Sequence, residues 1–181
     1  MNEKLLWHYT TLWHLDDIFR AGRLKTASKG VRRGERRAVW FSSNQRFEGT
    51  VQKGVIDKRT GLEQHFSTMD EIHVALGLVR FGVKRDDAPF VDWPTFKETS
   101  GITETEALAL EQAGADMGAD PLDWYAVFGA VASDKWTDIQ VWSGSIWWDL
   151  GLYRETREYI VRNPLTGEEC ALADISPAAR R

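Results

Sequence analysis

The stretch LLWHYTTLWHLDDIFRAGRL, residues 5–24, decides how the fold begins. Residues 5–10 are apolar and aromatic and finish on a polar residue, which predicts a short strand. Thr10 or Thr11 can cap a helix that follows directly, and Gly22 can end that helix. The apolar face of this predicted helix is formed by Leu12, Leu15, Ile18 and Phe19. A strand that leads straight into a helix is therefore the first expected unit of the fold.

The amino-acid composition changes twice after this strand and helix. Residues 23–37 are rich in Arg and Lys and contain two glycines. We expect a mobile basic loop there, because so many cations repel one another and cannot be buried together. The run AVWFS at 38–42 is compact and apolar, which predicts a buried strand.

The rest of the chain is expected to alternate strands with a few helices. The sequence predicts strands at 72–83, 136–142 and 158–162, helices around 59–66 and at 103–113, an aromatic turn-like stretch at 144–156, and a frayed tail at 165–181. No internal repeat or linker divides the chain, so 1–181 is predicted to be a single domain. This order of elements predicts the α+β class, built on mixed, mainly antiparallel sheets.

Composition excludes several classes of protein. The chain has 27 acidic and 23 basic residues, a balance that argues against a non-specific coat for nucleic acid. Cys170 is the single cysteine, which excludes an intrachain disulfide and a multi-cysteine metal site. The four histidines lack metal-ligand spacing, so no metal is expected. No apolar run is long enough to span a membrane and no signal-peptide core is visible, so we expect a cytoplasmic protein without membrane association.

Nine tryptophans are the one strong departure from an average composition. Tryptophan packs cores, stacks on rings and bases, and fills interfaces, so the number alone selects none of these uses. We expect most of them to be structural, because they lie among apolar neighbours. This group comprises Trp93, Trp124, Trp136, Trp142, Trp147 and Trp148.

Three segments far apart in the chain carry the functional signal, whereas P-loop, dinucleotide-fingerprint, nucleophile-elbow and zinc-protease motifs are absent. The segments are LWHYT at 6–10 with its helix, AVWFSSN at 38–44, and REYIVRNP at 157–164. In this order they resemble the ADP-ribosyltransferase fold in its His–Tyr–Glu branch, as in poly(ADP-ribose) polymerases and tRNA 2′-phosphotransferases. The resemblance implies a split β core with flanking helices.

The resemblance also implies a substrate and a set of site residues. It implies that NAD is the substrate and that ADP-ribose is transferred to a protein or nucleic-acid acceptor. Glu158 and His8 are implied to be catalytic and to converge on one cleft. The residues implied to bind NAD are His8, Tyr9, Thr10, Trp40, Phe41, Ser42 and Ser43. We expect Arg32, Arg33, Arg36 and Arg37 of the basic loop to contact the acceptor.

The chemistry of NAD explains why these residue types are needed. Breaking its glycosidic bond expels neutral nicotinamide and leaves a positively charged ribose, which a carboxylate stabilises. The sequence departs from the family pattern at Tyr9, where polymerases keep glycine. Gln140 in DIQVW competes for the glutamate position if residues 136–142 form the catalytic strand, and the site would then be altered or inactive.

Other interpretations of the same residues stay open. Small size suggests a bacterial or phage effector, toxin or defence protein by analogy. An RNA 2′-phosphotransferase would use the same fold and NAD but needs arginines that bind the phosphate. A non-enzymatic, tryptophan-rich module would bind single-stranded nucleic acid. Taken alone, His8 is also typical of a packed core histidine, and Glu158 of a surface ion pair worth at most about 1 kcal/mol.

Overall fold

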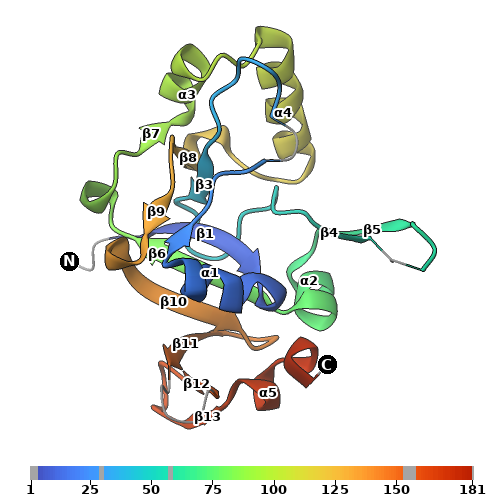
Figure 1. The fold of residues 1–181 in the computed structure, drawn as a ribbon, viewed down its shortest axis with the longest axis vertical. Helices are drawn as coiled ribbons and strands as arrows, with labels where there is room; N and C mark the ends of the chain where they lie inside the picture. The colour runs from blue at the N-terminus through green and yellow to red at the C-terminus, as the bar shows by residue number, and fades with distance from the viewer. Residues whose placement is uncertain (1–3, 29–30, 57–58, 153–157, 181) are drawn as a thin grey trace. The chain divides into compact units, whose positions relative to one another are not determined.

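The structure is a computed structural model that describes residues 4–28, 31–56, 59–152 and 158–180 (Figure 1). Helices and strands are mixed and strand pairing is mainly antiparallel, so the predicted α+β class is confirmed. The chain predicted as one domain divides into two compact units. The first unit comprises residues up to 8, 16–50 and 81–137, and the second comprises 9–15, 51–80 and 138 onward. Three strands, β1 (Leu6–Thr11), β6 (Leu78–Val83) and β10 (Trp136–Trp142), contribute residues to both units.

The sheet of the first unit is assembled around β1. Its strand order is β10, β6, β1, β3, β8 and β7, with β3 at Val39–Ser42, β8 at Trp124–Val127 and β7 at Val91–Asp92. β1 and β3 are antiparallel and in register at Trp7 and Ser42. The pair β2 (Arg23–Leu24) and β9 (Val131–Ala132) forms a separate two-stranded sheet. The strands predicted at 5–10 and 38–42 are confirmed as β1 and β3, and the structure shows in addition that they are neighbours.

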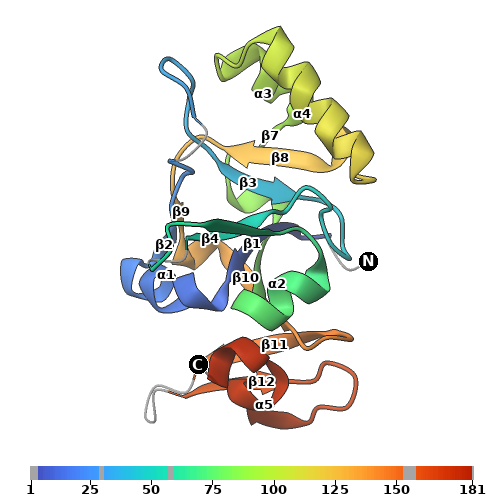
Figure 2. The ribbon, with the colours of Figure 1, turned by 90° about the vertical axis from the view of Figure 1, so that its right-hand side faces the viewer.

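Two helices of the first unit, α3 (Trp93–Thr99) and α4 (Glu104–Asp116), lie side by side next to β8 (Figures 1 and 2). Trp93 connects them to the sheet, because its ring stacks on Phe96 and meets Trp124 edge-on with centroids 5.2 Å apart. α4 begins at the capping box of Thr103 and Glu106, so the helix predicted at 103–113 is confirmed.

The second unit contains the C-terminal strands. Its strand order is β13, β12, β11, β10, β6 and β1, with β13 at Glu169–Ala171, β12 at Tyr159–Arg162 and β11 at Trp147–Leu152. The unit also contains the hairpin of β4 (Lys53–Ile56) and β5 (Glu63–Phe66), and helices α2 (Met69–Leu76) and α5 (Leu172–Ile175). Strands predicted at 136–142 and 158–162 are confirmed as β10 and β12.

Four predicted elements, most of whose residues lie in the second unit, differ wholly or in part from the structure. The expected strand at 72–83 is α2 followed by β6, separated at Gly77, whose φ of 68° favours glycine. The expected helix at 59–66 is mostly β5, and the turn-like stretch at 144–156 contains β11. Short apolar runs do not distinguish helix from strand by periodicity. The tail at 165–181 was expected to fray, but β13 and α5 anchor it through buried Leu172.

The remaining elements are short. They are α1 (Leu15–Ala21) and the 3-10 turns at Leu12–His14, Arg85–Asp87, Pro121–Asp123, Ser133–Lys135 and Pro177–Arg180. The helix predicted from residue 12 onward is thus a 3-10 turn that continues into α1. Among the residues that the structure describes, no helix combines the length and hydropathy of a membrane-spanning segment.

Most tryptophans expected to be structural are packed. Trp93, Trp124 and Trp148 are buried, and Trp136, Trp142 and Trp147 are half-buried against other aromatic rings or chain segments. Trp13, by contrast, is exposed. These six tryptophans therefore pack inside the protein and do not form an exposed groove on which bases could stack.

Candidate functional site

The first two functional segments meet in the first unit. His8 on β1 has its Nδ1 atom 2.8 Å from the backbone carbonyl oxygen of Trp40 on β3, so this nitrogen donates to that oxygen. The ring of His8 lies 5.7 Å, centroid to centroid, from the ring of Phe41. Three residues implied to bind NAD are therefore brought together by the pairing of β1 with β3.

Several implied NAD-binding side chains make contacts inside the protein. The Trp40 ring packs on Phe96 at 4.5 Å between centroids, and Phe41 is buried edge-on against Phe90. The hydroxyl of Ser43 donates to Asp123. Thr10 is buried and belongs, like Tyr9, to the second unit.

Ser42 belongs to a buried network that the sequence did not reveal. Its hydroxyl donates to Oε2 of Glu48 at 2.7 Å, and Glu48 is only 6% exposed. Oε1 of Glu48 accepts from the indole N–H of Trp124 at 3.1 Å and from the hydroxyl of Thr50 at 2.8 Å. A buried carboxylate with this many donors connects β3 and β8 with the loop that follows β3. Nothing in the pattern around Glu48 distinguishes it from a surface residue.

Two arginines of the basic segment contact other parts of the first unit. Arg23 begins β2, and Arg32 forms an ion pair with Glu106 of the α4 cap. The guanidinium of Arg36 lies 3.7 Å from the ring centre of Phe128, and its backbone N–H donates to the carbonyl of Ser100. Arg33 and Arg37 are exposed, and residues 29–30 lie outside the described residues. Within the described residues of 23–37, Arg32 contacts an acid and Arg36 an aromatic ring, while the arginine side chains stay exposed. The mobility of the loop stays a prediction.

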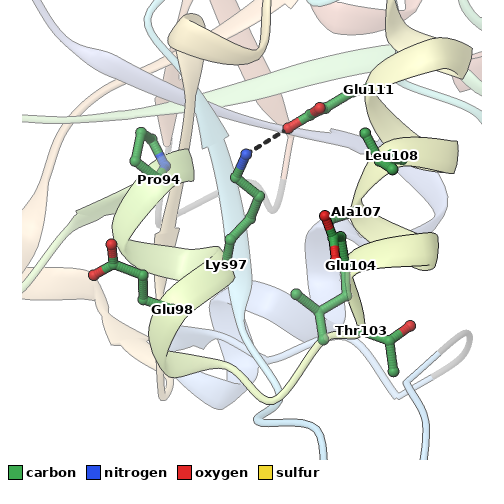
Figure 3. A pocket seen from close by; sticks show the side chains of 9 residues that line it. Pro94, Lys97, Glu98, Thr103, Glu104, Ala107, Leu108 and Glu111 are labelled. Carbon is green, nitrogen blue, oxygen red and sulfur yellow. Dashed lines mark hydrogen bonds and ion pairs between the residues drawn. The ribbon is translucent and has the colours of Figure 1, made fainter.

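An open groove lies between α3 and α4, with a volume of about 470 Å³ (Figure 3). Lys97 of α3 forms an ion pair with Glu111 of α4 across it at 2.8 Å, and Trp93 also donates to Glu111. These hydrogen bonds, that of Lys97 first, lower the pKa of the Glu111 carboxyl. No residue that the sequence implicated in binding or catalysis lines this groove.

The second unit contains a polar cluster, here called the Arg80 cluster, on one face of its sheet. Its members are Tyr9 of β1, Arg80 of β6, Asp138 and Gln140 of β10, and Trp147 and Asp149 of β11. Gln140 and Asp149 are directly opposite in the antiparallel register. Because alternate residues of a strand share a face, Asp138 lies on the face of Gln140 and Trp147 on that of Asp149.

Arg80 is the centre of this cluster and is only 5% exposed. Its Nε and Nη2 atoms donate to Oε1 of Gln140 at 2.9 and 2.5 Å. Its guanidinium lies 4.0 Å from the centre of the Trp147 ring, and it interacts with the Tyr9 hydroxyl. Burial lowers the pKa of Arg80 to about 10, which leaves it charged at neutral pH. The lone charge inside the apolar run LVRFGV was the one available sequence signal for this residue.

Two carboxylates of the cluster share one amide group. The Nε2 atom of Gln140 donates to Asp138 at 2.9 Å and to Asp149 at 3.1 Å. Burial, and then the charge of Asp149, raise the pKa of Asp138. The cluster therefore combines a buried cation with a pair of acids that differ in environment, an arrangement typical of functional sites. Sequence reasoning did not identify either aspartate.

The raised pKa of Asp138 leads to a prediction about stability. The pKa of Asp138 in the folded protein is higher than its ordinary value of 3.8. Above the folded pKa, ionised Asp138 therefore lowers the free energy of unfolding. Below pH 3.8 the carboxyl is protonated in both states, and this loss of stability is absent. Asp138→Asn should therefore raise Tm relative to wild type at pH 7, and the gain should vanish near pH 3. Thermal melting at both pH values checks this, with exposed Asp86→Asn as the control. Equal gains at both pH values would contradict it.

Lys53 of β4 contacts β1 at Tyr9. Its amine donates to the backbone carbonyl of Tyr9 at 2.8 Å, and burial lowers the pKa of this amine to about 8. Within the second unit, Tyr9 thus has contacts through both its backbone and its ring, whose centroid lies 6.2 Å from that of Trp147. Tyr9 therefore belongs to the Arg80 cluster.

The resemblance implies that Glu158 lies within a strand, but in the structure it lies just before one. It is exposed and directly precedes β12, and residues 153–157 before it lie outside the described residues. In the strand order, β6, β10 and β11 stand between β1 and β12, whereas only β6 stands between β1 and the Gln140 strand. The convergence of His8 and Glu158 on one cleft stays a prediction.

Comparisons with known proteins identified no relative of this chain. The chain matches no protein-family model, and neither the curated proteins nor the solved structures contain a significantly similar one. Within the described ranges, no group of three or more His, Cys, Asp or Glu side chains is arranged to hold a metal ion.

Proposed function

We propose that the protein is an NAD-dependent ADP-ribosyltransferase that modifies a macromolecular acceptor, on an ADP-ribosyltransferase-like split β core. The observation that supports this proposal is the direct pairing of β1 with β3. The resemblance to ADP-ribosyltransferases was inferred from segments 32 residues apart, and His8 of one is hydrogen-bonded to Trp40 of the other.

The bond between His8 and Trp40 has a chemical consequence. Because Nδ1 donates to the Trp40 carbonyl, a neutral His8 has its Nε2 atom as an acceptor. An acceptor of fixed orientation suits a ribose hydroxyl of NAD. In this proposal His8 orients the ribose, and the reaction needs a carboxylate to stabilise the positive charge at its anomeric carbon.

The proposal is tested by incubating the purified chain with NAD labelled in its adenylate half, together with cell lysate or nucleic acid. We expect label in a macromolecule and release of one nicotinamide per label. His8→Ala should reduce the rate at least about tenfold, as expected for loss of one orienting hydrogen bond. Exposed His14→Ala is the matched control and should keep the rate. Neither label nor nicotinamide from the wild-type chain would overturn the proposal.

A further inference from the structure

Helix α4 packs on the first unit with its smallest residues and presents its leucines to solvent. Ala107 and Gly114 are the buried residues of this helix. Ala107 belongs to the apolar core, and a Cβ atom on Gly114 would lie 2.6 Å from the ring of Trp124. Leu108 and Leu110, by contrast, are 58% and 45% exposed. A surface helix normally turns such residues toward the core, so packing within the unit does not explain why these leucines face outward.

Leu108 is part of a larger apolar surface, because it lines the groove between α3 and α4 (Figure 3). The apolar lining of this groove consists of Pro94, Ile102, Ala107 and Leu108. Apolar side chains that gather in a groove with a polar rim are typical of protein interaction sites, whereas single exposed leucines are common on any surface. Leu110 does not line the groove.

The polar side chains of the groove are mainly acidic. Glu98 of α3 and Glu104 of α4 are exposed and line it. Lys97 is the one cation among the described residues that line it, and its amine is already paired with Glu111 at 2.8 Å. The sequence of α4, ETEALALEQAGAD, contains four acids and neither lysine nor arginine. The groove therefore has a negative charge that complements a cationic partner.

We infer that the groove between α3 and α4 is the docking site for a basic amphipathic helix of another protein. An apolar side chain of that helix would pack on Leu108, and its Lys or Arg side chains would lie beside Glu98 and Glu104. A helix suits a groove between two helices, because side-chain ridges of one helix pack between those of another. A small molecule needs a cleft that buries most of its surface, whereas this groove is open. The inference concerns an interaction surface and does not depend on the proposed function.

The experiment uses the full chain and three fluorescently labelled peptides of about 15 residues, long enough to form a helix. The first peptide contains leucine and lysine, with the leucines on one helix face. The second has glutamate in place of every lysine, and the third has the composition of the first in shuffled order. We expect only the first to bind saturably in fluorescence anisotropy, with an affinity that falls as salt is added. Its binding should shift backbone amide resonances mainly within residues 94–111.

The apolar contact is tested by Leu108→Ala, which should weaken binding of the first peptide at least about fivefold, because the buried apolar area is lost. Leu110→Ala is the matched control, since Leu110 is exposed on the same helix outside the groove. It should stay within about twofold of wild type. Both leucines are exposed, so neither change should lower Tm measurably, and weaker binding will not reflect lost folding.

The charge contribution is tested by combining Glu98→Gln with Glu104→Gln. This double variant should weaken binding of the first peptide about fivefold and reduce its salt dependence. Asp86→Asn combined with Asp116→Asn removes two exposed charges outside the groove and should stay within about twofold of wild type.

Four outcomes would overturn the inference. The first is that none of the peptides binds at concentrations up to about 1 mM. The second is that the acidic peptide binds as tightly as the basic one. The third is that Leu108→Ala binds the basic peptide like wild type. The fourth is that the chain self-associates in sedimentation and Leu108→Glu abolishes this association, because the occupant of the groove is then a second copy of the chain.

Discussion

Glu48→Ala is expected to destabilise the first unit by about 3 kcal/mol, and this is one of the two largest effects expected for the chain. The side chain is buried and accepts hydrogen bonds from Ser42, Thr50 and Trp124. Alanine removes every acceptor at once and leaves these donors without a partner away from water, each costing about 1–3 kcal/mol if it finds none.

The measurement is chemical or thermal unfolding, where such a loss corresponds to a decrease in Tm of roughly 6–12 °C for a chain of this size. Glu48→Gln is the matched variant, because its amide oxygen still accepts from two donors and the Ser42 hydroxyl can rotate to accept from the new N–H₂ group. We expect it to lose only about 1 kcal/mol. A loss below about 1 kcal/mol for Glu48→Ala would show that the network contributes little to the stability of the first unit.

The importance of Glu48 could not be predicted from the sequence, whereas the strand it supports could. Val39–Ser42 is a short apolar run bounded by charged and polar residues, and such runs indicate buried strands whatever they pair with. Glu48 lies in the polar stretch NQRFEGT, where composition indicates an exposed loop. One of its three donor residues, Trp124, is 76 residues away in the sequence, and local patterning contains no information about it.

In the candidate site, too, some features could be predicted from the sequence and others could not. The resemblance implies one NAD site for His8 and Trp40, and this site stays a prediction. The structure pairs their strands because both are apolar. Asp138 and Asp149 were missed because an aspartate beside a strand's apolar residues is ordinarily a solvated residue of the outer face. Only the register of β10 with β11, and the neighbouring Arg80 of β6, identify them as a pair. Strand register is set by long-range packing, so a single sequence does not reveal it.

Arg80→Ala is the second change expected to have a large effect, with a loss of about 3–5 kcal/mol. The guanidinium is buried, donates twice to Gln140 and packs on the Trp147 ring. Its removal leaves the Gln140 oxygen without these donors and takes away the cation nearest to Asp138. Two acids would then repel each other on one sheet face without a compensating charge.

Arg80→Lys is the matched variant, because lysine keeps the charge but cannot donate two fixed hydrogen bonds or stack its head group flat on an indole. We expect it to recover roughly half of the loss, measured by urea unfolding at pH 7 followed by tryptophan fluorescence. Repeating the Arg80→Ala measurement near pH 3 should reduce its cost, since Asp138, whose pKa is raised, is then protonated and no longer needs the cation. If the cost of Arg80→Ala is the same at both pH values, Arg80 stabilises the second unit by packing alone, and its role in neutralising Asp138 and Asp149 is wrong.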